Sequence, residues 1–124
     1  MTAIADECVL IVDDEPDIRD TLRDVVEMAG CRAVMAANGA EALRQLERMR
    51  PCMIILDLVM PVMTGAEMLE IMRKAPENAS VPVLISTSAP SAAPAGEAVL
   101  AKPIDIHALW KWMRGRCTCA ASTG

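Results

Sequence analysis

The chain has 124 residues, of which 53% are hydrophobic and 23% are charged, a composition typical of one soluble globular domain rather than a disordered chain. Its net charge of −5 argues against nonspecific binding to nucleic-acid phosphates. No apolar run reaches the roughly 20 residues that span a bilayer. Asp6 and Glu7 stand where a signal peptide would carry lysines, so we expect a cytoplasmic protein without membrane contact.

Short apolar runs alternate with segments of helical periodicity. The runs predict buried strands over residues 8–14, 31–37, 52–57, 81–87 and 98–102. The periodic segments predict helices over about 16–29, 40–49, 66–74 and 104–114. The stretch "SAPSAAPAGE" between the last two strands is a poor helix former, because Pro94 would break a helix begun before it. This alternation predicts an α/β doubly wound domain with a parallel sheet covered on both faces.

The five cysteines have an odd count and a scattered spacing, which do not describe a disulfide framework. Cys8, Cys31 and Cys52 begin apolar segments, where we expect thiols that line the core. Cys117 and Cys119 form a C-x-C pair in a polar stretch, which is a weak metal signal on its own. A reduced, cytosolic protein fits this usage best. We expect one domain over residues 1–116 and a flexible tail over 117–124.

Polar residues end four of the predicted strands. They are Asp13 and Asp14 after the first strand, Asp57 after the third, Thr87 after the fourth and Lys102 after the fifth. One such residue could simply cap the helix that follows it. In parallel sheets, however, ligands bind outside the carboxyl ends of the strands, so all five residues at this edge favour a site.

Three carboxylates at one place repel one another, which raises a pKa or recruits a cation. Hard oxygen ligands suit Mg²⁺, with Mn²⁺ tolerated, and Mg²⁺ is a partner for phosphoryl groups. Lys102 and the Thr87 hydroxyl could contact the same phosphoryl oxygens. Asp57 ends the most apolar strand, and we expect it to be the nucleophile that forms an aspartyl phosphate.

Four blocks of the sequence, in order, resemble the receiver domain of bacterial two-component response regulators of the stand-alone type. They are "LIVDDEPDIRDTL", "IILDLVMPVMTGAEML", "PVLIST" and "LAKPID". The resemblance implies a flavodoxin-like five-stranded sheet of order 2-1-3-4-5. It also implies Mg²⁺ held by Asp14, Asp57 and the backbone carbonyl of Val59, with Asp13 contacting it through water.

The same resemblance implies roles and partners. A histidine kinase or phosphotransfer protein would phosphorylate Asp57, Lys102 would pair with the phosphoryl group, and Thr87 would move toward it as the switch. The chain would catalyse its own phosphorylation and dephosphorylation without being a conventional enzyme, and it would signal to a downstream protein rather than to nucleic acid. In this family Pro103 follows a cis peptide.

The chain departs from the family pattern in the segment that precedes Lys102. Thr87 and Lys102 are fifteen positions apart, several fewer than usual, so we expect the fourth helix to be shortened or missing. Val99 stands where the family carries an aromatic residue, which puts the usual output surface in doubt. Val59 and Ala89 are apolar and cannot orient an attacking water, which predicts slow self-dephosphorylation.

Three other functions are alternatives to this one. The main alternative is a degenerate receiver that acts as a phosphorylation-independent interaction module; the intact acidic set argues against it and the short segment before Lys102 argues for it. A phosphohydrolase with an aspartyl intermediate would want an acid at Val59. A nucleotide or flavin domain would want a glycine-rich or hydroxyl-rich first loop, whereas "DDEPD" would repel phosphate in the absence of a metal.

Overall fold

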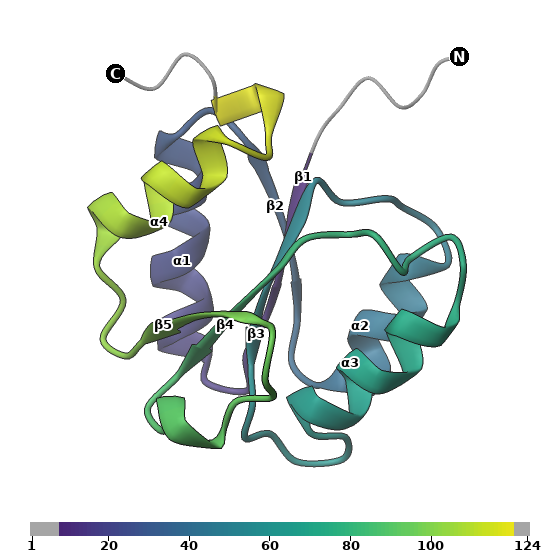
Figure 1. Cartoon of the computed structure of the whole chain (residues 1–124). Helices are drawn as coiled ribbons and strands as arrows, with labels where there is room; N and C mark the ends of the chain where they lie inside the picture. The colour runs from purple at the N-terminus through teal and green to yellow at the C-terminus, as the bar shows by residue number, and fades with distance from the viewer. Residues whose placement is uncertain (1–7, 121–124) are drawn as a thin grey trace.

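A computed structural model describes residues 8–120 of the chain. Its centre is one parallel sheet of five strands in the order β2-β1-β3-β4-β5, which confirms the predicted flavodoxin-like fold (Figure 1). The strands are β1 (Cys8–Val12), β2 (Arg32–Ala36), β3 (Met53–Asp57), β4 (Val83–Thr87) and β5 (Ala98–Ala101).

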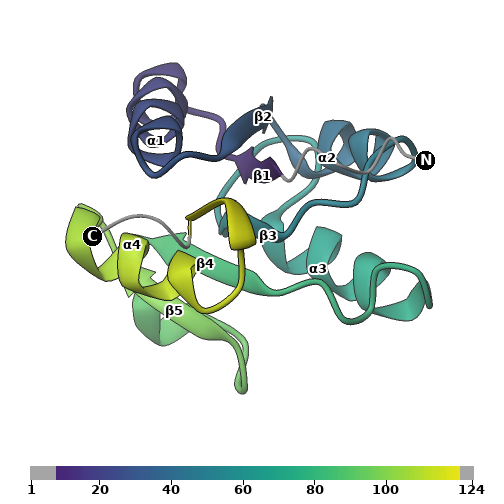
Figure 2. The ribbon, with the colours of Figure 1, turned by 90° about the horizontal axis from the view of Figure 1, so that it is seen from above.

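Helices cover both faces of the sheet, as Figures 1 and 2 show. One face carries α1 (Pro16–Met28) and α4 (Ile106–Arg114), and the other carries α2 (Gly39–Leu46) and α3 (Gly65–Lys74). Every residue of β1, β3 and β4 is buried, because these central strands have a helical layer on each side. None of the helices in the described part of the chain is long and apolar enough to cross a membrane.

Local signals in the sequence fix where the helices begin. Asn38 accepts a hydrogen bond from the Glu41 backbone N–H at the start of α2. Thr64 and Glu67 form a reciprocal capping box at the start of α3, which satisfies two backbone donors that the helix leaves unpaired. Asp105 caps α4 in the same way as Asn38 caps α2. The loops that precede these helices are therefore held in defined positions.

The fourth helix of the expected pattern is missing, as predicted. Only a short 3₁₀ turn, Pro90–Ala92, lies between β4 and β5, and the helix labelled α4 is the last one of the fold. Pro90 can start a turn, whereas Pro94 lacks the backbone N–H that a longer helix would need. No residue of β5 is buried, and Val99 lies half-buried at the margin of the core on the side of α2 and α3.

The expectation of core-lining thiols is wrong for Cys31 and Cys52, each of which is bonded to a cysteine of the C-x-C pair. Cys31 is bonded to Cys119, and Cys52 is bonded to Cys117. Cys8 is buried as expected and takes part in neither bond. The partners are 88 and 65 positions apart in the sequence, so their spacing carries no sign of the pairing, which only the fold brings about.

The tail is not loose over residues 117–120, contrary to expectation. A 3₁₀ turn, Thr118–Ala120, packs on the fold, with Cys117 and Ala120 buried. It seats against the turn between α1 and β2, where Gly30 has a φ of +99° and a side-chain Cβ would lie 2.9 Å from the Cys119 carbonyl oxygen. Residues 1–7 and 121–124, which include the rest of the predicted tail, lie outside the described residues.

Replacing Gly30 by alanine should destabilise the fold more than replacing Gly96 by alanine. Both glycines have positive φ, so each substitution costs about 1 kcal/mol in backbone conformation. Gly96 has no atom within 4 Å of an added Cβ, whereas Gly30 would press on the Cys119 carbonyl. We expect an additional loss of about 1 kcal/mol for Gly30→Ala, measured by urea unfolding. Equal losses would show that the terminal turn does not press on Gly30.

Candidate functional site

Asp57 is the last residue of β3 and lies in the middle of the carboxyl edge of the sheet. It is only 6% exposed, between β1 and β4. The chain then turns back sharply, and the Gly65 N–H donates a hydrogen bond to the Leu58 carbonyl over 2.9 Å. A Cβ on Gly65 would overlap the Asp57 carbonyl oxygen, so only glycine permits this close approach.

Two more carboxylates lie beside Asp57. Oxygens of Asp13, Asp14 and Asp57 lie within 4.8 Å of one another. Asp13 is 1% exposed, and its Oδ1 accepts a hydrogen bond from the Glu15 backbone N–H over 2.9 Å. The Arg19 guanidinium donates to the Asp13 carbonyl over 2.7 Å, which fixes the loop that carries the two acids.

Lys102 supplies the positive charge of this cluster. Its Nζ lies 2.9 Å from Asp13 Oδ2 and 3.5 Å from Asp57 Oδ1, with a Glu15 oxygen at 3.8 Å. The Lys102 backbone N–H donates to the Thr87 carbonyl over 2.8 Å, which holds it beside the end of β4. The bond between Lys102 and Pro103 is cis, as the family resemblance implied.

Thr87 ends β4 and is 1% exposed. Its Oγ1 accepts a hydrogen bond from the Ala89 backbone N–H over 3.0 Å, so its own O–H is left to donate elsewhere. In the sheet register Asp57 lies opposite Ser86, the residue before Thr87. The fold therefore brings Thr87, Lys102 and the three predicted acids to one edge.

The charges in the cluster shift two pKa values. The pKa of Asp57 is raised, because burial disfavours its charge and Asp13 repels it, although Lys102 and a hydrogen bond with the Val59 backbone oppose this. Burial disfavours the charge of Lys102, but its hydrogen bond to Asp13 and the surrounding carboxylates outweigh burial and raise its pKa. The Asp57 carboxyl therefore ionises less readily than an ordinary aspartate, and the Lys102 ammonium group beside it keeps its charge.

Three contributors to the site were missed by sequence reasoning. Glu15 and Arg19 contact the acid loop, and Gly65 allows the turn after Asp57. All three lie inside the quoted blocks, which was the available signal. The loop after Asp57 also exposes two valines: Val59 is 72% exposed, and Val62 is 82% exposed with a φ of +70°, a strained conformation for a β-branched residue.

Comparison with known proteins gives the same family as the geometry of the acidic edge indicates. The family model of the response regulator receiver domain matches residues 9–113. The chain belongs to this family. The acidic edge with Asp57 is therefore the carboxyl edge of a receiver domain.

The share of each relative's length that this chain matches varies among the relatives. A protein-glutamate methylesterase/protein-glutamine glutaminase of Hahella chejuensis is 43% identical over 77% of this chain, but the match covers only 26% of that protein. Sporulation initiation phosphotransferase F of Bacillus subtilis is 38% identical over 63% of each protein. The solved receiver domain of the Pseudomonas aeruginosa sensor histidine kinase PA1611, with a magnesium ion in its active-site cleft, is 25% identical, with a TM-score of 0.83 over 90% of this chain and 98% of that chain.

Replacing Asp57 by asparagine should stabilise this receiver at neutral pH. A raised pKa in the folded state means that ionised Asp57 opposes folding above that pKa, and the amide removes this penalty. We expect the free energy of unfolding to rise by about 1 kcal/mol at pH 7. The gain should shrink as the pH falls and vanish once Asp57 is protonated in both states.

The matched control is Asp24→Asn, since the Asp24 side chain is 66% exposed on α1. It should change the free energy of unfolding by no more than about 0.5 kcal/mol. Urea titrations of both variants between pH 4 and pH 8 give the comparison. A loss of stability in Asp57→Asn at pH 7 would mean that attraction to Lys102 dominates over burial and repulsion.

Proposed function

We propose that this receiver is a phosphorylation switch, in which Asp57 accepts a phosphoryl group from a histidine kinase or phosphotransfer protein in the presence of Mg²⁺. The observation that carries this proposal is the position of the buried Asp57 carboxylate, 3.5 Å from Lys102 Nζ and within a cluster of three carboxylates. The similarity to a phosphotransferase and to a magnesium-bound receiver supports it.

The donor set fits Mg²⁺, since clustered carboxylate oxygens at a partly open edge are the ligands that this ion prefers. In the proposal Asp14, Asp57 and the Val59 carbonyl hold the ion, and Asp13 contacts it through water. Mg²⁺, or Mn²⁺ in its place, would supply positive charge for the phosphoryl oxygens. Asp13 also has the separate task of holding Lys102 in place over 2.9 Å.

The protein groups then have distinct tasks in the transfer. An oxygen of Asp57 forms a bond to phosphorus while the phosphorus–nitrogen bond to the donor histidine breaks, and the electron pair of that bond leaves with the imidazole nitrogen. The Lys102 ammonium pairs with one phosphoryl oxygen, and the Thr87 O–H donates to another. Because the Thr87 hydroxyl sits next to Ala89, its movement would pull on the loop after β4.

An apolar cavity of about 210 Å³ next to Lys102 supports docking of a donor protein on this side. It opens between α1 and the connection from β5 to α4, and its lining includes Ile18, Leu22 and Ile104. Ile106 on its rim is 41% exposed. An apolar side chain of the donor could fill this cavity while its histidine approaches Asp57. We place this exchange, and a downstream protein target, in the cytoplasm.

One observation favours the second candidate function, a phosphorylation-independent interaction module. The short turn Pro90–Ala92 replaces the helix between β4 and β5, which leaves β5 partly exposed. A surface of this kind could bind a partner whether or not Asp57 is modified. The two functions differ in whether partner binding requires the acidic edge.

Incubation with acetyl phosphate and Mg²⁺ should add one phosphoryl group to the chain, detected as intact mass. Asp57→Asn should show no gain, and Asp24→Asn should gain as the wild type does. Chelating the divalent metal should abolish the gain in the wild type and in Asp24→Asn. A folded wild type without any gain, even with histidine kinases or phosphotransfer proteins as donors, would favour the interaction module.

The phosphorylated chain should lose its phosphoryl group slowly, with a half-life of minutes or longer at neutral pH. Val59 and Ala89 carry no group that could orient an attacking water. Val59→Asn supplies such a group beside Asp57 and should shorten the half-life by roughly 3–10-fold. Val62→Asn is the matched control, since it puts the same side chain on the same loop. A wild-type half-life of seconds, or an equal effect of both variants, would contradict this account.

A further inference from the structure

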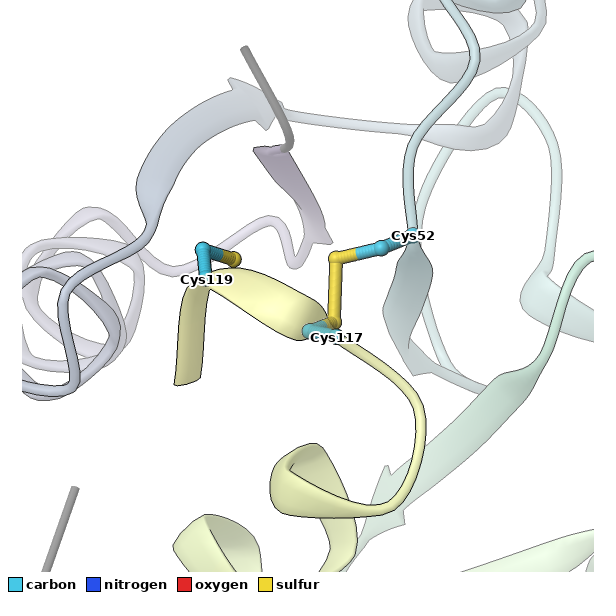
Figure 3. Close-up of side chains that lie close together, drawn as sticks. All are labelled: Cys52, Cys117 and Cys119. Carbon is cyan, nitrogen blue, oxygen red and sulfur yellow. A yellow bond between two sulfur atoms is a disulfide. The ribbon is translucent and has the colours of Figure 1, made fainter. Parts of the chain in front are cut away.

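Four cysteine sulfurs gather at the edge of the sheet opposite to the acids. The sulfur atoms of Cys52, Cys117 and Cys119 lie within 4.8 Å of one another, and Cys31 joins them through its bond to Cys119. Figure 3 shows the Cys119 side chain directed toward the bond between Cys52 and Cys117. The two disulfides are therefore neighbours in a single sulfur cluster.

We propose that, in the reduced protein, these four cysteines form a tetrahedral thiolate site for a soft divalent cation, with zinc as the expected metal. Four thiolates are a common donor set of structural zinc sites. A zinc–sulfur bond of about 2.3 Å sets the sulfurs of such a site roughly 3.8 Å apart. Three of the sulfurs lie within 4.8 Å of one another, and the Cys31 sulfur is bonded to that of Cys119, so side-chain rotations after reduction would complete the set.

Contacts other than the disulfides place these cysteines. The Cys117 N–H donates to the Met113 carbonyl over 2.8 Å, and the Cys52 N–H donates to the Cys8 carbonyl over 2.9 Å. Ala120 is fully buried, which seats the terminal turn on the fold. We therefore expect the four thiols to stay together after both disulfides are reduced.

The donor set and its position separate this site from the acidic one. The cluster near Cys52 contains only sulfur ligands, which favour zinc over magnesium, whereas the acidic cluster contains only oxygen ligands. Cys52 directly precedes β3 and Asp57 ends it, so the two residues lie about 16 Å apart along the strand direction. Cys31 and Cys117 are buried, whereas Cys52 and Cys119 are partly exposed and give a metal ion access.

A phosphine reductant delivers two electrons to each disulfide and becomes a phosphine oxide by taking an oxygen atom from water. The two protons of that water bind the two sulfurs, which become thiols. Zinc then binds four thiolates, and four protons pass to solvent. Clustered cysteines in a reducing compartment are more often metal ligands than disulfides, which is the setting we propose for this protein.

Metal binding here would fasten the C-terminal turn to the starts of β2 and β3, as the disulfides do in the oxidised form. Because the site does not exist in the unfolded chain, its binding energy would add to the stability of the fold. The same four cysteines would thus hold the C-terminal turn by disulfides in the oxidised chain and by metal–sulfur bonds in the reduced chain.

The test is a titration of the phosphine-reduced full chain with Co²⁺, in excess Mg²⁺ that occupies the acidic site. We expect one Co²⁺ per chain, with sulfur-to-cobalt charge-transfer absorption and the intense visible bands of tetrahedral cobalt. Zn²⁺ should displace it. The oxidised chain should show none of these bands, and Zn²⁺ should protect four thiols of the reduced chain from alkylation.

Cys52→Ser and Cys119→Ser should each weaken metal binding by roughly 100-fold or more. Cys8→Ser is the matched control, since this buried cysteine lies outside both disulfides, and it should bind as the wild type does. If a serine variant fails to fold, the wild-type titration and thiol protection still decide the matter. A reduced and folded wild type that gives no sulfur-to-cobalt absorption, or a Cys52→Ser variant that binds equally well, would overturn the proposal.

Discussion

The balance of charge around Lys102 is the constraint on which the acidic edge depends. Asp13 and Asp57 are almost fully buried, and two such carboxylates within a few ångströms would be costly without a cation. The Lys102 ammonium meets both of them, because β5 runs beside β4 and the Lys102 backbone N–H donates to the Thr87 carbonyl at the end of β4. The sheet order, the short β5 and the position of the acids are thus parts of one arrangement.

The same arrangement limits which elements of the fold could move in response to a change at Asp57. In the described part of the chain, a short turn is all that lies between Thr87 and β5, so no helix on that side can shift as a unit. On this side, the loop after β4 and the connection from Lys102 to α4 join the acidic edge to the rest of the fold. The Trp110 ring on α4 donates to the Val25 carbonyl of α1 over 3.0 Å. A signal that leaves through this side would move α4 against α1.

Sequence reasoning located the strands and the acidic edge because both follow from local pattern. The apolar run before Asp57 and the polar ends of the other strands carry that information in consecutive residues. The pairing of Cys31 with Cys119 does not, since it depends on where α1 ends and where the last turn docks. The strained Val62 was missed for a related reason: nothing in its neighbours predicts a positive φ at a β-branched residue, and it lies in a three-residue turn that the Met63 N–H closes on the Pro61 carbonyl over 2.7 Å.

The bond between Cys31 and Cys119 also determines how the oxidised chain would respond to a pulling force. Tension applied at the two ends would pass from residue 31 to residue 119 through the sulfur atoms, bypassing the 87 residues between them. Among the strands and α-helices of residues 8–120, only β1 and α1 lie on the loaded path. The strands that carry Asp57, Thr87 and Lys102 would bear no direct load, whereas in the reduced, metal-free chain they would extend with the rest.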